Sequence, residues 1–141
     1  AKRETTDTIV IHCTQTPPNM DIDVDKVTQW HKERGFDTIG YHFLIKRDGT
    51  LQEGRQQDEV GAHAVAVNGN SIGVAMVGGG TPNMGWEDNF APIQFETLKT
   101  IIIKLKKDYN IEKIIGHYQV DDKKECPSFD VPKWLEKHNL T

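Results

Sequence analysis

Two histidines and one cysteine are placed where they could together hold a metal ion. His12 closes the apolar run at residues 8–11, His117 closes a second run at residues 113–116, and Cys126 follows nine positions later. We expect both runs to be strands, and ligands at strand ends are held by the sheet while they face the loops, where a pocket can form. Catalytic zinc sites typically use three protein ligands and leave the fourth position for water or substrate. The pattern therefore favours a hydrolytic metal site over a structural one.

The other cysteine, Cys13, is expected to serve the core. Because it directly follows His12 on the same predicted strand, the two side chains should point to opposite faces of the sheet. A disulfide between Cys13 and Cys126 is formally allowed, but a chain of 141 residues does not need one. We predict that Cys13 is a small buried apolar residue.

Three of the six histidines are weaker ligand candidates. His31 lies within a predicted helix, and His138 lies in the last turn of another, where a cation favours the helix dipole. His42 alternates with Tyr41 on a predicted strand, so only one of these two side chains can face the site. We expect Tyr41 to face it.

Composition and charge describe an ordinary globular protein. Hydrophobic residues make up 36% and charged residues 27% of the 141, the formal charge is −4 and the pI is about 5.8. Scattered lysines and arginines argue against a nucleic-acid partner. No apolar stretch is long enough for a membrane span or for the hydrophobic region of a signal peptide, so we expect a cytoplasmic protein on synthesis.

The elements that must position the candidate site alternate between strands and helices. Asp48-Gly49 is a strong two-residue hairpin signal, Asp23 and Asp130 are helix N-cap candidates, and Pro92 suits the first turn of a long helix. Strands are expected at residues 8–13, 41–47, 50–53, 71–77 and 113–116, and helices at 24–34, 92–109 and 131–138. This order predicts a single α/β domain, with a central mixed β-sheet flanked by helices and a core at about residues 8–138.

Five segments along the chain carry a family resemblance. They are Ile9-Val10-Ile11-His12-Cys13, the stretch from Gly40 to Thr50, Gly61-Ala62-His63-Ala64, Asn70-Ser71-Ile72-Gly73-Val74, and the stretch from Lys124 to Asp130. With these segments in this order, the chain resembles the zinc-dependent N-acetylmuramoyl-L-alanine amidases, the type 2 amidase and peptidoglycan recognition protein superfamily. Within it, the chain is most similar to the short single-domain phage lysozymes that are amidases.

The resemblance implies one Zn²⁺ per chain, held by His12, His117 and Cys126. It places Tyr41 and Lys124 beside the metal as catalytic residues. Zinc can lower the pKa of a water molecule to about 7, and a lysine cation can stabilise the oxyanion that forms when an amide is attacked. Tyr41 could orient the water or relay a proton to the leaving amine.

The resemblance also implies that His63 and Asn70 lie along the substrate groove. The loop before Cys126 carries an unusually charged insert at residues 121–123, which raises the question whether Lys123 or Lys124 is the catalytic lysine. We choose Lys124 because it keeps the two-residue step to the cysteine.

The resulting expectation is hydrolysis of the amide bond between N-acetylmuramic acid and L-alanine in peptidoglycan, by a phage endolysin that is a monomer and reaches the cell wall after release. One alternative is a cysteine peptidase with Cys126 as nucleophile and His117 as base, for which no orienting third residue is identified. Another is a non-catalytic module that binds peptidoglycan or a protein. Non-catalytic relatives typically lack the zinc cysteine, which is present here, but a second role with a regulatory protein partner is compatible with these residues.

Overall fold

Apolar strands at the centre of the protein organise the fold. The computed structural model describes all residues from 1 to 141, and its five strands form one sheet in the order β3-β2-β4-β1-β5. The strands are β1 Thr8–Cys13, β2 Phe43–Ile45, β3 Leu51–Glu53, β4 Ser71–Met76 and β5 Lys113–Gly116. β1 pairs in parallel with β4 and β5, β2 pairs in parallel with β4, and only the β2–β3 hairpin is antiparallel. The predicted mixed sheet is thus confirmed.

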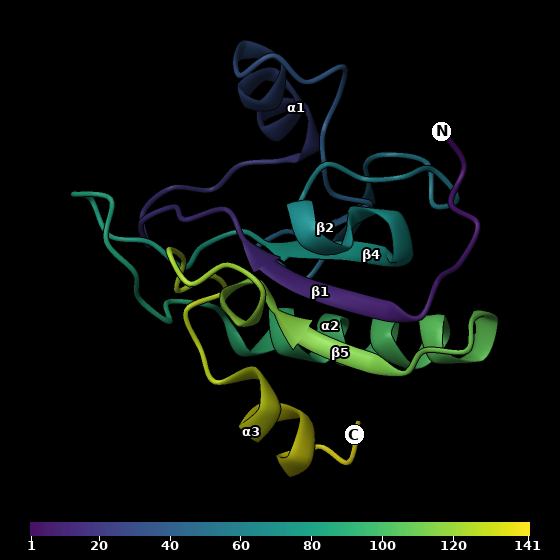
Figure 1. The fold of residues 1–141 in the computed structure, drawn as a ribbon. Helices are drawn as coiled ribbons and strands as arrows, with labels where there is room; N and C mark the ends of the chain where they lie inside the picture. Colours follow the sequence, from purple (N-terminus) through teal and green to yellow (C-terminus); the bar gives the residue numbers. More distant parts are fainter.

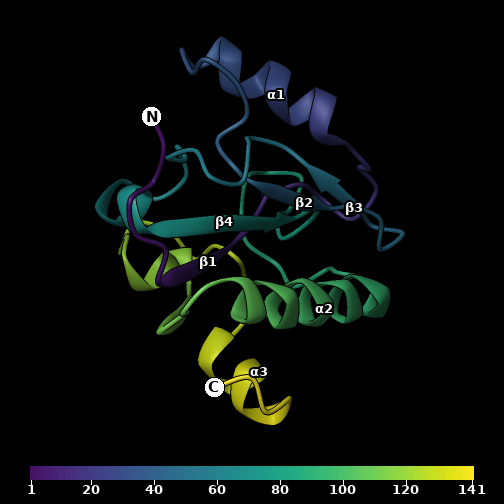
Figure 2. The ribbon, with the colours of Figure 1, turned by 90° about the vertical axis from the view of Figure 1, so that its right-hand side faces the viewer.

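The helices cover both faces of this sheet (Figures 1 and 2). α1 (Val24–Glu33) lies on one face, whereas α2 (Pro92–Asp108) and α3 (Val131–Lys137) lie on the other. Side chains alternate along β1 accordingly, because Ile9 and Ile11 belong to the core beneath α2. On the α1 side, a smaller core includes Val27 and Leu44. His12 directly follows Ile11 on the strand and therefore points to the opposite side of the sheet, the side that carries α1.

The hairpin lies where it was predicted, but its turn is one residue longer than the two residues expected. The Lys46 N–H donates to the Thr50 carbonyl and the Gly49 N–H donates to the Lys46 carbonyl, so residues 47–49 form the turn, with Gly49 at a φ of 88° in the left-handed region. The predicted cap residues perform their expected roles. Asp23 accepts a hydrogen bond from the Lys26 backbone N–H, and Asp130 accepts one from Lys133. Predicted boundaries of the long elements are correct to within one or two residues.

Two local predictions were incomplete. The strand expected at residues 41–47 is regular only over Phe43–Ile45, since Lys46 already belongs to the hairpin turn and accepts the Gly49 N–H. The stretch before β4, expected to be irregular, contains a 3₁₀ helix at Val65–Asn70.

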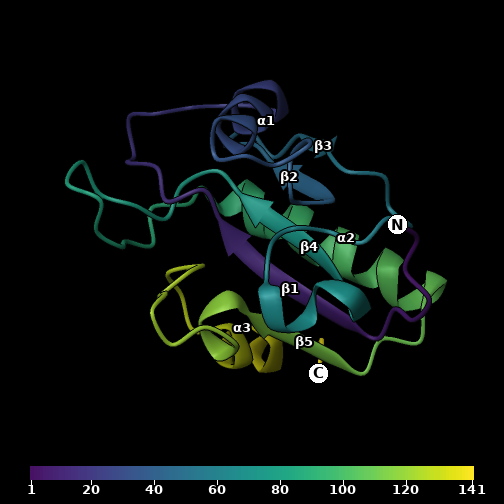
Figure 3. The same ribbon diagram turned by 45° about the horizontal axis from the view of Figure 1, so that its top comes forward.

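In Figure 3, the loop after β4 extends away from the sheet as an arm. No helix is both long and apolar enough to cross a membrane.

Candidate metal centre and active site

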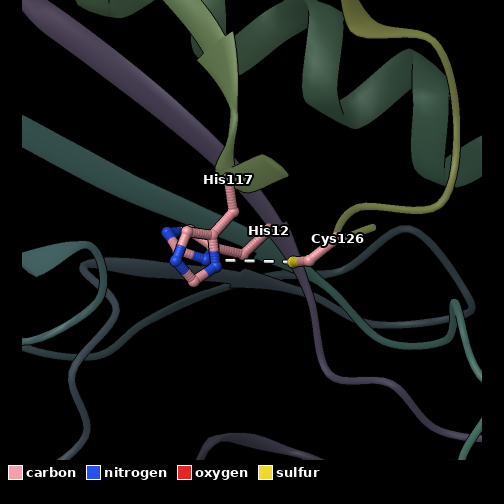
Figure 4. A group of neighbouring side chains, drawn as sticks. All are labelled: His12, His117 and Cys126. Carbon is pink, nitrogen blue, oxygen red and sulfur yellow. Dashed lines mark hydrogen bonds between the residues drawn. The ribbon is translucent and has the colours of Figure 1, made fainter. Parts of the chain in front are cut away.

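The three predicted ligands converge at one edge of the sheet (Figure 4). β1 and β5 are parallel neighbours, and the register pairs Ile11 with Gly116, so the next residues, His12 and His117, emerge side by side. The loop after β5 brings in Cys126, and the ligand atoms of the three residues all lie within 4.8 Å of one another. His12 is 1% exposed and Cys126 is 4% exposed. The arrangement predicted from the strand ends is therefore present in the structure.

The donor set fits zinc. Two imidazole nitrogens and one thiolate are borderline-soft ligands that zinc accepts in tetrahedral sites. Zinc bonds of roughly 2.0–2.3 Å separate tetrahedral ligand atoms by roughly 3.3–3.8 Å. The Cys126 Sγ and His12 Nδ1 are 4.0 Å apart. The three ligand atoms lie within 4.8 Å of one another, so the widest pair would approach by up to roughly 1–1.5 Å to close around an ion.

The surroundings of Cys126 make its thiolate depend on a nearby cation. Burial raises the pKa of this thiol well above its ordinary value, and the adjacent Cys13 thiol raises the pKa further. The backbone N–H of Cys13 donates a hydrogen bond to Sγ at 3.0 Å, and this bond and the Lys124 charge act in the opposite direction. Burial dominates, so a free thiolate is disfavoured, which argues against Cys126 as a nucleophile without metal.

The two histidines of this group are held neutral. Burial and the neighbouring histidines lower the pKa of His12 well below its ordinary value. Burial also lowers the pKa of His117, and the Asp121 carboxylate, 3.8 Å from Nε2, partly offsets this effect. Neutral imidazoles offer the lone pair that a metal requires.

A cavity of about 720 Å³ opens over the three ligands. Its walls include Tyr41 and Lys124, and Val65, which is 96% exposed, lies at its edge. Trp86, from the arm after β4, contributes a further wall. The cavity is therefore open to solvent and wide enough for an extended ligand.

Comparisons with known proteins show the family of this chain. The family described as N-acetylmuramoyl-L-alanine amidase matches residues 2–129. The chain belongs to this amidase family. The amidase is 43% identical over 139 residues to the endolysins of Klebsiella phage KP32 and Escherichia phage T7, covering 99% of this chain and 91% of each relative.

Solved structures show the same fold in related proteins. The N-acetylmuramoyl-L-alanine amidase LysC from Clostridium intestinale has a TM-score of 0.81 at 33% identity, over 97% of this chain and 87% of LysC. Drosophila PGRP-LB also has a TM-score of 0.81, at 25% identity, over 99% of this chain and 85% of the fly protein. A mutant of PGRP-LB has been solved in complex with tracheal cytotoxin.

Tyr41 lies at the cavity of the amidase, as expected, and His42 faces away from it. The Tyr41 and His12 ring centroids are 5.0 Å apart. Burial raises the pKa of the Tyr41 phenol, and the nearby Cys126 raises it further, so Tyr41 stays protonated. His42 is instead held by the backbone, with Nδ1 accepting the Gly73 N–H and Nε2 donating to a carbonyl oxygen.

The charged loop before Cys126 presents one of its two lysines to the cavity. Lys124 lines the cavity and Lys123 does not. The backbone turns at this point, and the Lys124 N–H donates to the Asp121 carbonyl. Asp121 also lines the cavity and lies beside His117. Sequence reasoning had noted Asp121 only as part of a charged insert, although its position four residues after His117 was a usable signal.

The two residues expected in the substrate groove have different surroundings. His63 lines the cavity and is 9% exposed, but both of its ring nitrogens are engaged within the protein, with His12 and with Ser71. The structure does not bring Asn70 to the cavity. Its amide donates to Asp7 at the opposite end of β1 from the ligands, because Asn70 directly precedes β4, which runs parallel to β1. Asn68, which sequence reasoning missed, lines the cavity in its place.

Proposed function

We propose that this amidase is a zinc-dependent phage endolysin that cleaves the bond between N-acetylmuramic acid and L-alanine in peptidoglycan. The observation that carries the proposal is the convergence of His12, His117 and Cys126 at an open cavity. Similarity to phage endolysins supports the biological role. The complex of a PGRP-LB mutant with tracheal cytotoxin, a monomeric peptidoglycan, supports peptidoglycan as the kind of ligand bound.

In this proposal the three ligands hold one zinc ion, which when bound supplies Lewis-acid activation of water and of the amide carbonyl. Tyr41, a neutral phenol, donates a hydrogen bond to the attacking water or to the carbonyl oxygen and thereby orients it. The Lys124 cation at the cavity edge stabilises the oxyanion. Breaking the C–N bond leaves a carboxylate on the lactyl group and, after protonation, a free amine on L-alanine.

The rest of the proposal concerns where the enzyme acts. We expect a monomer that is made in the cytoplasm and acts on the cell wall after release. Residues of the exposed arm at 81–89 offer a surface for a regulatory protein partner, in addition to catalysis.

The experiment that tests the proposal is digestion of purified peptidoglycan by metal-stripped protein, with and without added zinc. Zinc-dependent release of new amino groups without new reducing sugar is the expected result. Cys126→Ser, which removes a ligand, should show no release with or without zinc.

Other outcomes distinguish the alternatives. Release of amino groups without any need for metal would favour the cysteine peptidase, with Cys126 as nucleophile and His117 as base. Retained binding to peptidoglycan without cleavage at any zinc concentration would favour the non-catalytic module. New reducing sugar would indicate a glycosidase and contradict both the proposal and the family assignment.

A further inference from the structure

The ring of His63 lies between a proposed metal ligand and a buried serine. Its Nδ1 is 2.8 Å from Nε2 of His12, and its Nε2 is 3.3 Å from Oγ of Ser71. The Ser71 hydroxyl is in turn 2.7 Å from the backbone carbonyl oxygen of Val67. Four groups thus form one continuous chain of hydrogen bonds that ends at the metal centre.

The directions of these hydrogen bonds follow from the Val67 end of the series. A carbonyl oxygen only accepts, so the Ser71 hydroxyl donates its proton to Val67. Ser71 Oγ is then left as an acceptor, and Nε2–H of His63 donates to it. Nδ1 of neutral His63 is consequently unprotonated and accepts Nε2–H of His12. His12 is left with a bare Nδ1, the atom that lies 4.0 Å from Cys126 Sγ.

The protein makes room for this arrangement at two glycines. A Cβ at Gly73 on β4 would lie 2.7 Å from Cγ and 2.8 Å from Nδ1 of His63, so the ring packs directly on the strand backbone. A Cβ at Gly61 would lie 2.6 Å from Cδ2 of His63. The Asn68 side-chain oxygen accepts the backbone N–H of His63 and so holds the backbone from which the His63 side chain extends. The ring is therefore held from several directions.

We propose that His63 is a positioning residue for the metal centre: together with Ser71 it fixes the tautomer of His12 so that Nδ1 is presented to the metal ion. This inference rests on the proposed zinc site. It gives His63 a role through His12, whereas the family resemblance suggested direct contact with substrate.

The chemical nature of His63 has a consequence for the charge of the centre. Metal-bound histidines commonly donate their second N–H to a carboxylate, a backbone carbonyl or water. A neutral imidazole at this place adds no negative charge, so two neutral histidines and one thiolate leave a centre with Zn²⁺ at a net charge of +1. That positive charge favours an oxyanion in the transition state.

The inference is tested first on the metal-free protein by ¹⁵N NMR of the histidine rings. Long-range ¹H–¹⁵N correlations distinguish protonated from bare ring nitrogens, and we expect both His12 and His63 to be protonated at Nε2 only. A His12 that carries its proton on Nδ1 would overturn the inference. This readout needs neither zinc nor substrate, so failure to detect amidase activity would contradict the proposed function and leave the tautomer result standing.

Zinc affinity of variants supplies the second test. His63→Phe keeps a ring without an acceptor, and we expect zinc affinity, measured by chelator competition, to fall ~10–100-fold, the range typical of changes next to a ligand. His63→Asn keeps an acceptor oxygen near the place of Nδ1 and should recover much of this loss. His138→Asn removes a histidine from the far side of the protein and serves as the matched control.

Ser71→Ala removes the group that orients His63 while leaving both histidines in place. We expect the His63 NMR signals to show a mixture of tautomers and the zinc affinity to fall several-fold. An unchanged His63 tautomer in Ser71→Ala, or a His63→Phe protein that binds zinc as tightly as His138→Asn, would refute the proposed role. If His63→Phe does not fold, the NMR result on the unmodified protein still decides the question.

Discussion

His42 is fully buried next to the active site, and its protonation state should control the stability of the protein at low pH. Its Nδ1 accepts the Gly73 N–H at 3.0 Å and its Nε2 donates to the Glu59 carbonyl at 2.8 Å, so neutral His42 is completely satisfied. The pKa of His42 is lowered from its ordinary value of 6.5 to about 4, chiefly by burial and also by the charges of Arg3 and Arg55, while the hydrogen bond to the Glu59 carbonyl acts in the opposite direction. Protonation at Nδ1 would remove the acceptor for Gly73.

The sign of the effect follows from comparing the folded and unfolded states. Between pH 6.5 and about 4 the unfolded chain holds a proton on His42 that the folded protein excludes. Acid therefore favours unfolding in this window. The loss at pH 5 is about 2 kcal/mol, and it reaches about 3 kcal/mol below the folded-state pKa. Around pH 5 the contribution of His42 to the slope is about 1.2 kcal/mol per pH unit.

Urea unfolding of metal-free protein between about pH 4.5 and 7.5, followed by circular dichroism, measures this dependence. Other buried histidines contribute as well, so the decisive comparison is with His42→Asn. An asparagine oxygen can accept the Gly73 N–H near the position of Nδ1 but does not titrate. We expect the variant to lose some stability at neutral pH and to show a slope shallower by about 1 kcal/mol per pH unit near pH 5. Parallel curves for the two proteins would refute the reasoning.

Three further predictions concern the candidate site. Cys126→Ser should weaken zinc binding, measured by chelator competition, by more than the ~10–100-fold typical of a change next to a ligand, whereas Cys13→Ser should bind zinc normally and cost only stability; loss of zinc in Cys13→Ser would show that its side chain faces the metal. Tyr41→Phe should keep its zinc and lose ~10²–10⁴-fold in kcat, and loss of metal instead would make Tyr41 a structural residue. Lys124→Met should lower kcat by ~10²–10³-fold through the lost oxyanion contact, while the neighbouring Lys123→Met should remain active; the reverse pattern would exchange the two assignments.

The sequence predicted the strands and the meeting of His12 with His117 well because both depend on local pattern. Residues 8–13 and 113–116 are uninterrupted apolar runs, and a histidine at the end of each one leads to the site once the strands pair. Tyr41 and His42 lie just before β2, but His42 still pairs with the backbone of Gly73 and Gly54, and the two side chains point in opposite directions as the predicted alternation requires. These inferences required no knowledge of the loops.

The loop residues were harder to place because their positions depend on packing between distant segments. The place of His63 is set by Gly73 on β4 and by Asn68, and no local pattern encodes these contacts. Asn70 was assigned to the groove by resemblance, but the end of the 3₁₀ helix directs it towards Asp7. Asp121 is a different case, because its position four residues after His117 was a local signal that was not used.

The parallel pairing of β1 determines how late in folding the proposed zinc site can form. Its partners begin far along the chain, since Thr8 pairs with Ser71 and with Lys113, and Cys126 lies 114 positions from His12. Closing such long loops is slow, because the chain loses conformational entropy before the stabilising contacts between the strands can form. No ligand pair that includes Cys126 and His12 can form in the early, local phase of folding. Zinc uptake during refolding should therefore coincide with the last phase, and a nascent chain should acquire its metal only when the segment around Cys126 has left the ribosome.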